Sequence, residues 1–198
     1  MKSKVLMGLA AIAMVAFLSS CGKVPQAKID AVTAAIDSAK VLQADVYVPG
    51  EFAAVQDSMK AISADVEKIN SKLFKNFKAV EVKLDQALAA AKLVQTNAVA
   101  KKEEVKKEVE TLLTDIKTVI EENKKLFVRA PRGKEGAQVL EQMKTEMATV
   151  ETSVTEAQGM YDSGAYMDAF NKVKAAKETA DRINGEVKEA IKKVGGRI

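Results

Sequence analysis

Histidine and tryptophan are absent from the sequence, and Cys21 is the only cysteine among its 198 residues. Most zinc sites need histidine or several thiolates, and the common nucleophilic active sites pair serine or cysteine with histidine. The missing residues therefore exclude these sites, and a single cysteine excludes a disulfide within the chain. Aromatic residues make up only 5% of the sequence, a composition that suits close helix–helix packing better than one thick globular core.

A strong charge of one sign is also lacking. The formal net charge is +4, and removal of residues 1–20 would take away two lysines and no acid. The remaining lysines interleave with acids, as in the segment KKEEVKKEVE at 101–110. Nucleic-acid binding needs a patch of one charge sign, so we expect no nucleic-acid partner. No motif for a small-molecule substrate is evident either.

The N-terminal segment has the layout of a secretory signal. Lys2 and Lys4 precede a run of apolar and small residues at 5–17, and such a positive region before a short apolar one is typical of signal peptides. A helix of this length would reach only about 20 Å, against a hydrocarbon core of roughly 30 Å. We therefore expect residues 1–20 to be a signal peptide rather than a membrane span.

The four residues Leu18, Ser19, Ser20 and Cys21 end this segment. They resemble the bacterial lipoprotein lipobox, in which a branched apolar residue and two small ones precede a cysteine. The resemblance implies cleavage between Ser20 and Cys21, a diacylglyceryl group on the Cys21 sulfur and an acyl chain such as palmitate on the new amine. A thiol is a suitable nucleophile for the thioether, and several acyl chains give stable anchoring. The alternative is an ordinary signal peptide followed by a chance cysteine.

Residues 21–26 then form a lipidated tether. Gly22, and not aspartate, follows Cys21. By resemblance to the sorting rule of Gram-negative bacteria, this implies the outer membrane, with the chain facing the periplasm. In a cell with a single membrane, the same signal implies the outer cell surface.

Downstream of Pro25, apolar residues recur at helical spacing. The first such row is followed by VYVPGE at 46–51, where Pro49 and Gly50 are expected to end the helix. A second row then runs to Leu73, shifts phase at Phe77 and continues. These rows comprise Ile29, Val32, Ile36 and Ala39, then Phe52, Val55, Met59, Ile62, Val66, Ile69 and Leu73, then Val80, Leu84, Ala87, Ala91 and Val94, and finally Val105, Val109, Leu112, Ile116 and Val119.

Residues 51–130 contain neither glycine nor proline. They therefore form either one very long helix or a chain that turns without the usual signals. We favour a turn at 70–76, because Asn and Ser cluster in INSKLFKNF and the apolar repeat slips there. The alternative is a stutter within a continuous helix.

The second half of the chain repeats this pattern. In VRAPRGKE, Pro131 and Gly133 take the places of Pro49 and Gly50, and Gly164 within YDSGAY interrupts the next row. The rows there are Leu140, Met143, Met147, Val150, Val154, Ala157 and Tyr161, with Val139 also matching Val55, and Phe170, Val173, Ala176, Ala180, Ile183 and Val187 within a last helix at 167–193. We therefore predict an all-α fold, an elongated antiparallel helical bundle of tandem helix–turn–helix units with a long central helix. The expected units are 27–127 and 128–198.

The segment AAIDSAKVLQADVYVPGEFAAVQDSMKAISADV at 34–66 resembles an uncharacterised Ala-rich helical domain of bacterial envelope lipoproteins. That domain has a Tyr-x-Pro turn and sometimes precedes domains of the outer-membrane-protein-A type. YDSGAYMDAF at 161–170 is similar to its closing helix. The resemblance covers most of 26–100 and a part of 131–190, and it implies no activity.

Three classes of function are compatible with a chain of this kind. We expect a structural spacer or scaffold in the bacterial envelope, with membrane lipid bound through Cys21 and no cofactor beyond the acyl chains. The alternative is a tetratricopeptide-like binding module or periplasmic chaperone, in which Tyr47, Phe52, Tyr161 and Tyr166 are candidate contacts for an envelope partner, although aromatics beside helix turns usually staple helices together. The apolar rows could also close between chains, in a coiled-coil oligomer. An enzyme would need acids such as Glu103, Glu104 and Glu108, or Glu121 and Glu122, to converge. Because these acids lie among lysines at helical spacing, we expect no catalysis.

Overall fold

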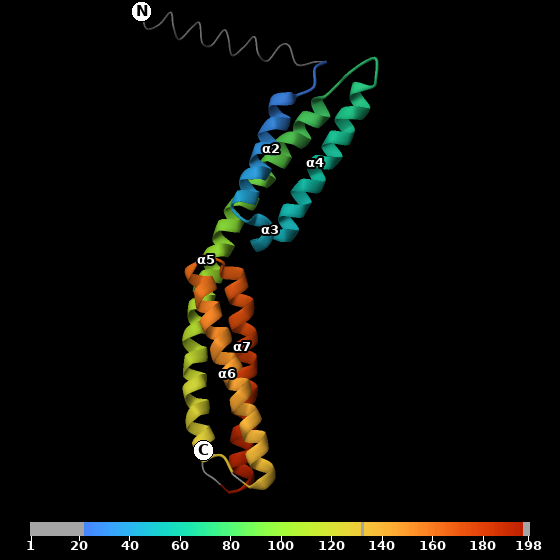
Figure 1. Ribbon diagram of the computed structural model, residues 1–198. Coiled ribbons are helices and arrows are strands. Elements are labelled where there is room, and N and C mark those ends of the chain that lie inside the picture. The colour runs from blue at the N-terminus through green and yellow to red at the C-terminus, as the bar shows by residue number, and fades with distance from the viewer. Residues whose placement is uncertain (1–21, 132, 196–198) are drawn as a thin grey trace, which may run out of the picture. The chain divides into compact units, whose positions relative to one another are not determined.

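A computed structural model describes residues 22–131 and 133–195, without the side chains of residues 134 and 135. All regular structure in these residues is α-helical, which confirms the all-α helical bundle (Figure 1). The helices are α2 (Gln26–Val41), α3 (Ala44–Tyr47), α4 (Pro49–Asn70), α5 (Lys78–Arg129), α6 (Lys134–Asp162) and α7 (Tyr166–Lys193).

The chain divides into two compact units, Met1–Lys101 and Lys102–Ile198. The division lies inside α5, earlier than the boundary expected after residue 127. The physical reason is that the second part of α5 belongs to the C-terminal bundle, where its Asn123 contacts α7. Pro131 and Gly133 thus lie in the α5–α6 connection within the second unit, although they had suggested a boundary.

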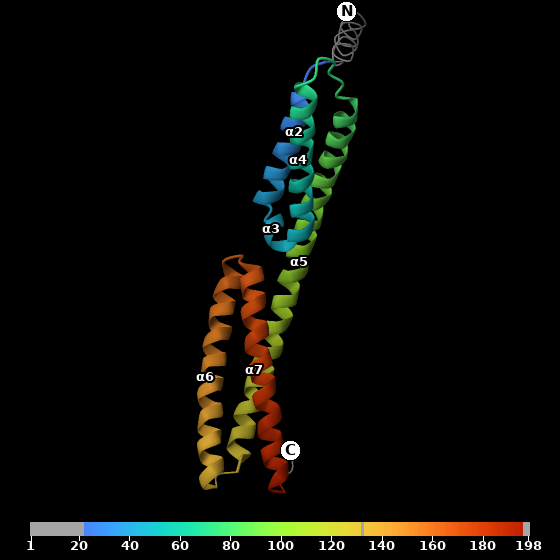
Figure 2. The ribbon, with the colours of Figure 1, turned by 90° about the vertical axis from the view of Figure 1, so that its right-hand side faces the viewer.

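In the first unit, α2, α4 and the first part of α5 run in alternating directions and pack through two apolar clusters. One cluster joins Val32 of α2, Ile62 of α4 and Leu84 of α5. The other joins Ala39 of α2, Phe52 of α4 and Ala91 of α5. Neighbouring helices in the sequence are therefore antiparallel, as Figures 1 and 2 also show. The predicted rows at 29–39 and 80–94 lie in these two clusters.

The turn between α2 and α4 differs from the expectation. Helix α2 already ends at Val41, and Gln43 adopts a left-handed conformation with φ of 62°. Pro49 is the first residue of α4 and Gly50 lies in the same helix, because the fixed φ of proline suits the first helical turn. The break thus comes from Gln43, whereas Pro49 and Gly50 begin the next helix.

The favoured turn between residues 70 and 76 is confirmed, because α4 ends at Asn70 and α5 begins at Lys78. Phe77 is buried at this turn and packs in the cluster with Leu84. Leu73, which the apolar row had assigned to the helix, is instead 98% exposed in the connecting loop. The predicted row therefore continued three residues past the end of α4.

In the second unit, α6 and α7 form an antiparallel hairpin that packs against the second part of α5 (Figure 2). The α5–α6 connection holds Pro131 and Gly133, and Gly133 is the N-cap of α6. The α6–α7 turn holds Gly164, whose φ of 84° is one that glycine adopts without strain. The buried residues of the hairpin are Leu140, Met147, Val150, Val154 and Ala157 in α6, and Ala169, Val173, Ala176, Ala180, Ile183, Val187 and Ile191 in α7.

At a few positions the predicted row is shifted by one residue. Leu113 and Ile120 are buried in α5, whereas in α6 the predicted Leu140 is buried as expected. The predicted Leu112 and Val119 are only half-buried, and Val139 is exposed. An α-helix drifts relative to a strict seven-residue repeat, so a row extrapolated along a long helix moves from the core to its edge.

Candidate functional site

The predicted lipidation site lies outside the described residues. Ser20 and Cys21 belong to the part of the chain that the structure does not describe, and the described part starts with Gly22, which is exposed. None of the described helices has the length and apolar character needed to cross a membrane. Cleavage and lipidation at Cys21 therefore stay predictions from the sequence.

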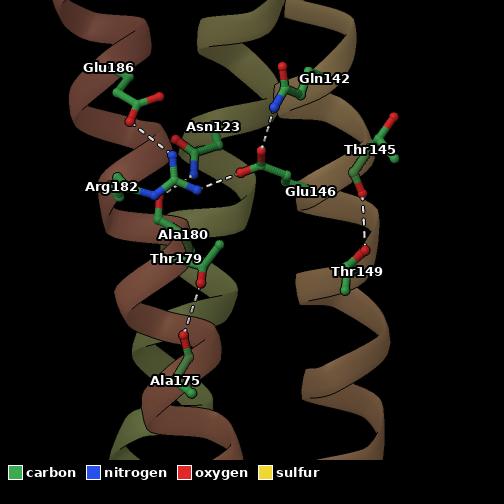
Figure 3. A network of polar contacts seen from close by, with 10 residues as sticks. All are labelled: Asn123, Gln142, Thr145, Glu146, Thr149, Ala175, Thr179, Ala180, Arg182 and Glu186. Carbon is green, nitrogen blue, oxygen red and sulfur yellow. Dashed lines mark hydrogen bonds and ion pairs between the residues drawn. The ribbon is translucent and has the colours of Figure 1, made fainter.

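The most organised polar site among the described residues surrounds Asn123 of α5, whose side chain is fully buried. Its amide nitrogen donates a hydrogen bond of 2.9 Å to the carbonyl oxygen of Ala180 in α7 (Figure 3). Its amide oxygen accepts a bond of 2.8 Å from the amide nitrogen of Asn184. A buried amide needs such partners, because leaving it without them would cost its full desolvation energy. These two hydrogen bonds fix the register of α5 against α7 along the helix axes.

Next to Asn123, Arg182 of α7 crosses to α6. Figure 3 shows its guanidinium between Glu146 of α6 and Glu186 of α7. Gln142 donates a further hydrogen bond to Glu146, at 3.3 Å. The hydrogen bond from Arg182 lowers the pKa of Glu146 below its usual value. The group therefore remains ionised at neutral pH and holds the two helices of the hairpin together.

Two further ion pairs connect α5 with its neighbours in the same region. Glu122 of α5 accepts a bond of 2.8 Å from Lys188 of α7, and this bond lowers the pKa of Glu122. Lys124 lies 3.0 Å from both Glu121 and Glu151, and the hydrogen bond to Glu151 of α6 raises the pKa of Lys124. The three helices of the second unit are thus joined pairwise by charges.

The acids considered for catalysis fall into two groups. Glu121 and Glu122 bond to lysines, as described above, and Glu103, Glu104 and Glu108 are exposed. Among the residues that the structure describes, no group of three or more acids or cysteines is placed to hold a metal ion. Of these acids, Glu122 forms an ion pair between helices, with Lys188 of α7.

Two of the four candidate contact aromatics lie together at the α6–α7 turn. The rings of Tyr161 and Tyr166 are 5.3 Å apart between centroids. The Nζ atoms of Lys102 and Lys106 each lie 5.9 Å from the centroid of the Tyr166 ring. The Tyr161 hydroxyl donates a hydrogen bond to Glu110 of α5, and this bond raises the pKa of Tyr161 to about 12. The cluster fastens the turn to α5.

The other two aromatics are buried in the first unit. Tyr47 of α3 and Phe52 of α4 are no more than 6% exposed. Phe52 packs in the cluster that contains Ala39. Their surfaces are covered by the unit itself, so the structure places them in the core rather than on a surface for a partner.

An apolar cavity of about 440 Å³ lies at the other end of the second unit, between α6 and α7 near the α5–α6 connection. Its walls include Pro131, Val139, Met143 and Val187, and Lys193 lies at its edge. Val139 is 51% exposed, so part of this apolar surface faces solvent. Sequence reasoning had not identified this cavity, because its walls come from three separated segments.

Comparison with protein-family models, with curated proteins and with solved structures finds no match to this chain. The resemblance to the lipobox and to the Ala-rich helical domain therefore stays a prediction. The Asn123 network was also missed, although its signal was present. Asn123 lies at helical spacing from Ile116 and Ile120, and a polar residue within an apolar row often fixes the pairing of helices.

Proposed function

We propose that this chain is a lipid-anchored scaffold of the bacterial envelope, cleaved before Cys21 and attached to the outer membrane by acyl chains. The proposal includes no catalytic activity and no cofactor beyond those chains. The sequence supports the anchor through Leu18, Ser20 and Cys21 in lipobox order. The structure supports the scaffold through the way in which its helices are cross-linked.

The observation that carries the scaffold is a series of ion pairs along the second unit. Lys172 pairs with Glu156, Arg182 with Glu146, and Lys188 with Glu122. On α7 these contacts extend from residue 172 to residue 188, which corresponds to about 24 Å of helix. A single exposed ion pair contributes little to stability, but these three separate pairs, spaced along α7, together support one register of α7 against α5 and α6. A unit fixed in this way suits a mechanical or spacing role.

The anchor is tested in cells by expressing the full chain with its own N-terminal segment. Mass spectrometry should show Cys21 as the first residue, carrying diacylglycerol and an N-acyl chain, and the protein should fractionate with membranes. Cys21→Ser should abolish the modification. Ser19→Ala is the matched control, because it keeps a small residue beside the cleavage site and should still be processed. An unmodified thiol on the wild-type mature chain would refute the anchor.

The scaffold is tested by complementation of a strain that lacks the protein. We expect envelope integrity, measured as leakage of a periplasmic enzyme, to be restored by the wild-type chain and not by Cys21→Ser. A chain with Glu103→Gln and Glu108→Gln should restore it fully, because these exposed acids play no part in the scaffold. Loss of rescue in this double variant would favour a chemical role for the acids.

The apolar cavity favours a second candidate, a module that binds an unfolded or apolar segment of an envelope protein. Met143 lines this cavity, so Met143→Glu should place a charge in it and abolish suppression of client aggregation. Val128→Glu is the control, since Val128 is 72% exposed and does not line the cavity. Equal activity of both variants, or none in the wild-type chain, would reject this function.

A further inference from the structure

We propose that the loop at 71–77 is a second membrane contact, in which Leu73 and Phe74 insert into the boundary between lipid headgroups and acyl chains. The proposal rests on the proposed lipid anchor and adds a contact that the anchor does not require. It concerns the first unit alone. Four features of this unit support it, namely its topology, the reach of the chain, the exposure of the loop tip and the charge around it.

The topology places the loop at the end of the unit where the described chain starts. Val24, just before α2, and Ile69, at the end of α4, both pack against the cluster that contains Phe77. The start of α2, the end of α4 and the start of α5 therefore meet at one end of the bundle, as Figures 1 and 2 both show. The loop connects two of these three segments.

The reach of the chain brings that end to the bilayer. Val24 is held against the cluster, and Cys21 precedes it by three residues. Three residues span at most about 10 Å when fully extended. Acyl chains on Cys21 would therefore hold this end of the first unit within roughly that distance of the headgroup region. The loop would then face the membrane by geometry alone.

The tip of the loop is apolar and uncovered. Leu73 is 98% and Phe74 is 93% exposed, whereas Phe77 is 1% exposed. The loop is nevertheless held at its ends, because Lys75 bonds to the side chain of Asn70 and Asn76 accepts a bond from the backbone N–H of Lys78. A leucine and a phenylalanine side by side at a constrained tip are suited to an interface that is partly apolar.

The charge around the tip fits anionic headgroups. Lys68, Lys72, Lys75 and Lys78 surround the two apolar residues, and the sequence has no acid at 68–80. Elsewhere in this unit lysines form ion pairs, Lys28 with Asp85, Lys60 with Asp57 and Lys83 with Asp65. Within the loop, the sequence offers Lys72, Lys75 and Lys78 no acid. Basic residues beside an apolar tip favour a surface that contains anionic lipid. This combination favours a lipid surface over a protein groove, which would need to cover the lysines as well.

The test uses the absence of tryptophan from the sequence. Phe74→Trp introduces a single fluorophore into the full chain, which is processed in cells, purified and reconstituted into vesicles of phosphatidylethanolamine and phosphatidylglycerol with brominated acyl chains. Val41→Trp is the control, because Val41 is 83% exposed and ends α2, away from the loop. We expect the tryptophan of Phe74→Trp to emit at shorter wavelength and to be quenched, and that of Val41→Trp to do neither.

The lysines provide a second measurement. Adding Lys72→Gln and Lys75→Gln to Phe74→Trp should reduce the ratio of inserted to free loop about fivefold for each lysine in vesicles with anionic lipid. In vesicles of phosphatidylcholine alone the same changes should have no effect. Equal quenching of the Phe74→Trp and Val41→Trp variants would overturn the proposal, and so would quenching that the lysine changes leave unaltered in anionic vesicles.

Mass spectrometry of the same samples separates this proposal from the anchor. If Cys21 is lipidated and the tryptophan of Phe74→Trp is not quenched, the loop proposal fails and the anchor stands. If Cys21 is unmodified and that tryptophan is still quenched when vesicles are added, the anchor fails and the loop contact stands. If Cys21 is unmodified and the tryptophan is not quenched, both the anchor and the loop contact are rejected.

Discussion

Replacement of the buried Asn123 by alanine is the sharpest test of how the second unit is held together. Asn123→Ala removes the hydrogen bonds to Ala180 and from Asn184. Each such bond contributes about 0.5–1.5 kcal/mol, and the better helix propensity of alanine returns roughly 0.5 kcal/mol. We therefore expect the free energy of unfolding of this unit to fall by about 0.5–2.5 kcal/mol.

Asn171→Ala is the matched control, because it makes the same chemical change at an exposed position of α7. Here only helix propensity acts, so stability should rise by about 0.5 kcal/mol. Hydrogen exchange of α7 peptides, read by mass spectrometry, reports this unit separately from the first. If the amides of α7 are protected from exchange as strongly in the Asn123→Ala variant as in the Asn171→Ala variant, the buried amide does not hold α5 and α7 together.

Three further substitutions test other parts of the structure. The bond to Glu110 raises the pKa of Tyr161 from 10.0 to about 12, so its contribution to stability should be complete below pH 10 and lost as pH rises towards 12. Tyr161→Phe should remove this alkaline loss from urea titrations, and an unchanged pH profile would contradict the assignment. Phe77→Ala should lower the free energy of unfolding by about 3–5 kcal/mol, because this side chain is buried. Phe74→Ala should change it by less than about 0.5 kcal/mol, because that side chain is exposed. Similar urea midpoints for the two variants would refute the difference in burial. Gly185→Ala should raise stability by about 0.5–1 kcal/mol, because a Cβ there would meet no atom within 4 Å, and a lower melting temperature would disprove it.

Much of the helical pattern followed from local sequence. The rows through Val32, Leu84 and Val173 predicted core faces correctly, because burial of one helical face produces a regular spacing. The loop after Asn70 was also found, since the apolar row slipped there. The ends of helices were less predictable. Helix α2 ends just before Gln43, which adopts a left-handed conformation although it is neither a glycine nor a proline.

The polar contacts between helices could be predicted only in part. That lysines and acids would pair was evident from their interleaving, but the partners of Arg182 and Lys188 lie far away in the sequence. Such pairs depend on the register of packed helices, which spacing along one helix does not determine. The burial of Phe52 agrees with its place in the predicted apolar row, and the burial of Tyr47 agrees with the packing role that aromatics beside helix turns usually have.

The core of the first unit is rich in alanine, with Ala35, Ala39, Ala44, Ala91 and Ala98 in one cluster. Side chains this small let neighbouring backbones come close, and they leave little volume for a larger residue to occupy. Residues on the outward faces of these helices can therefore be substituted freely, whereas the alanines of the buried cluster can be replaced only by residues of similar size. Any relative that has drifted far in sequence should still be recognisable by small residues at these positions.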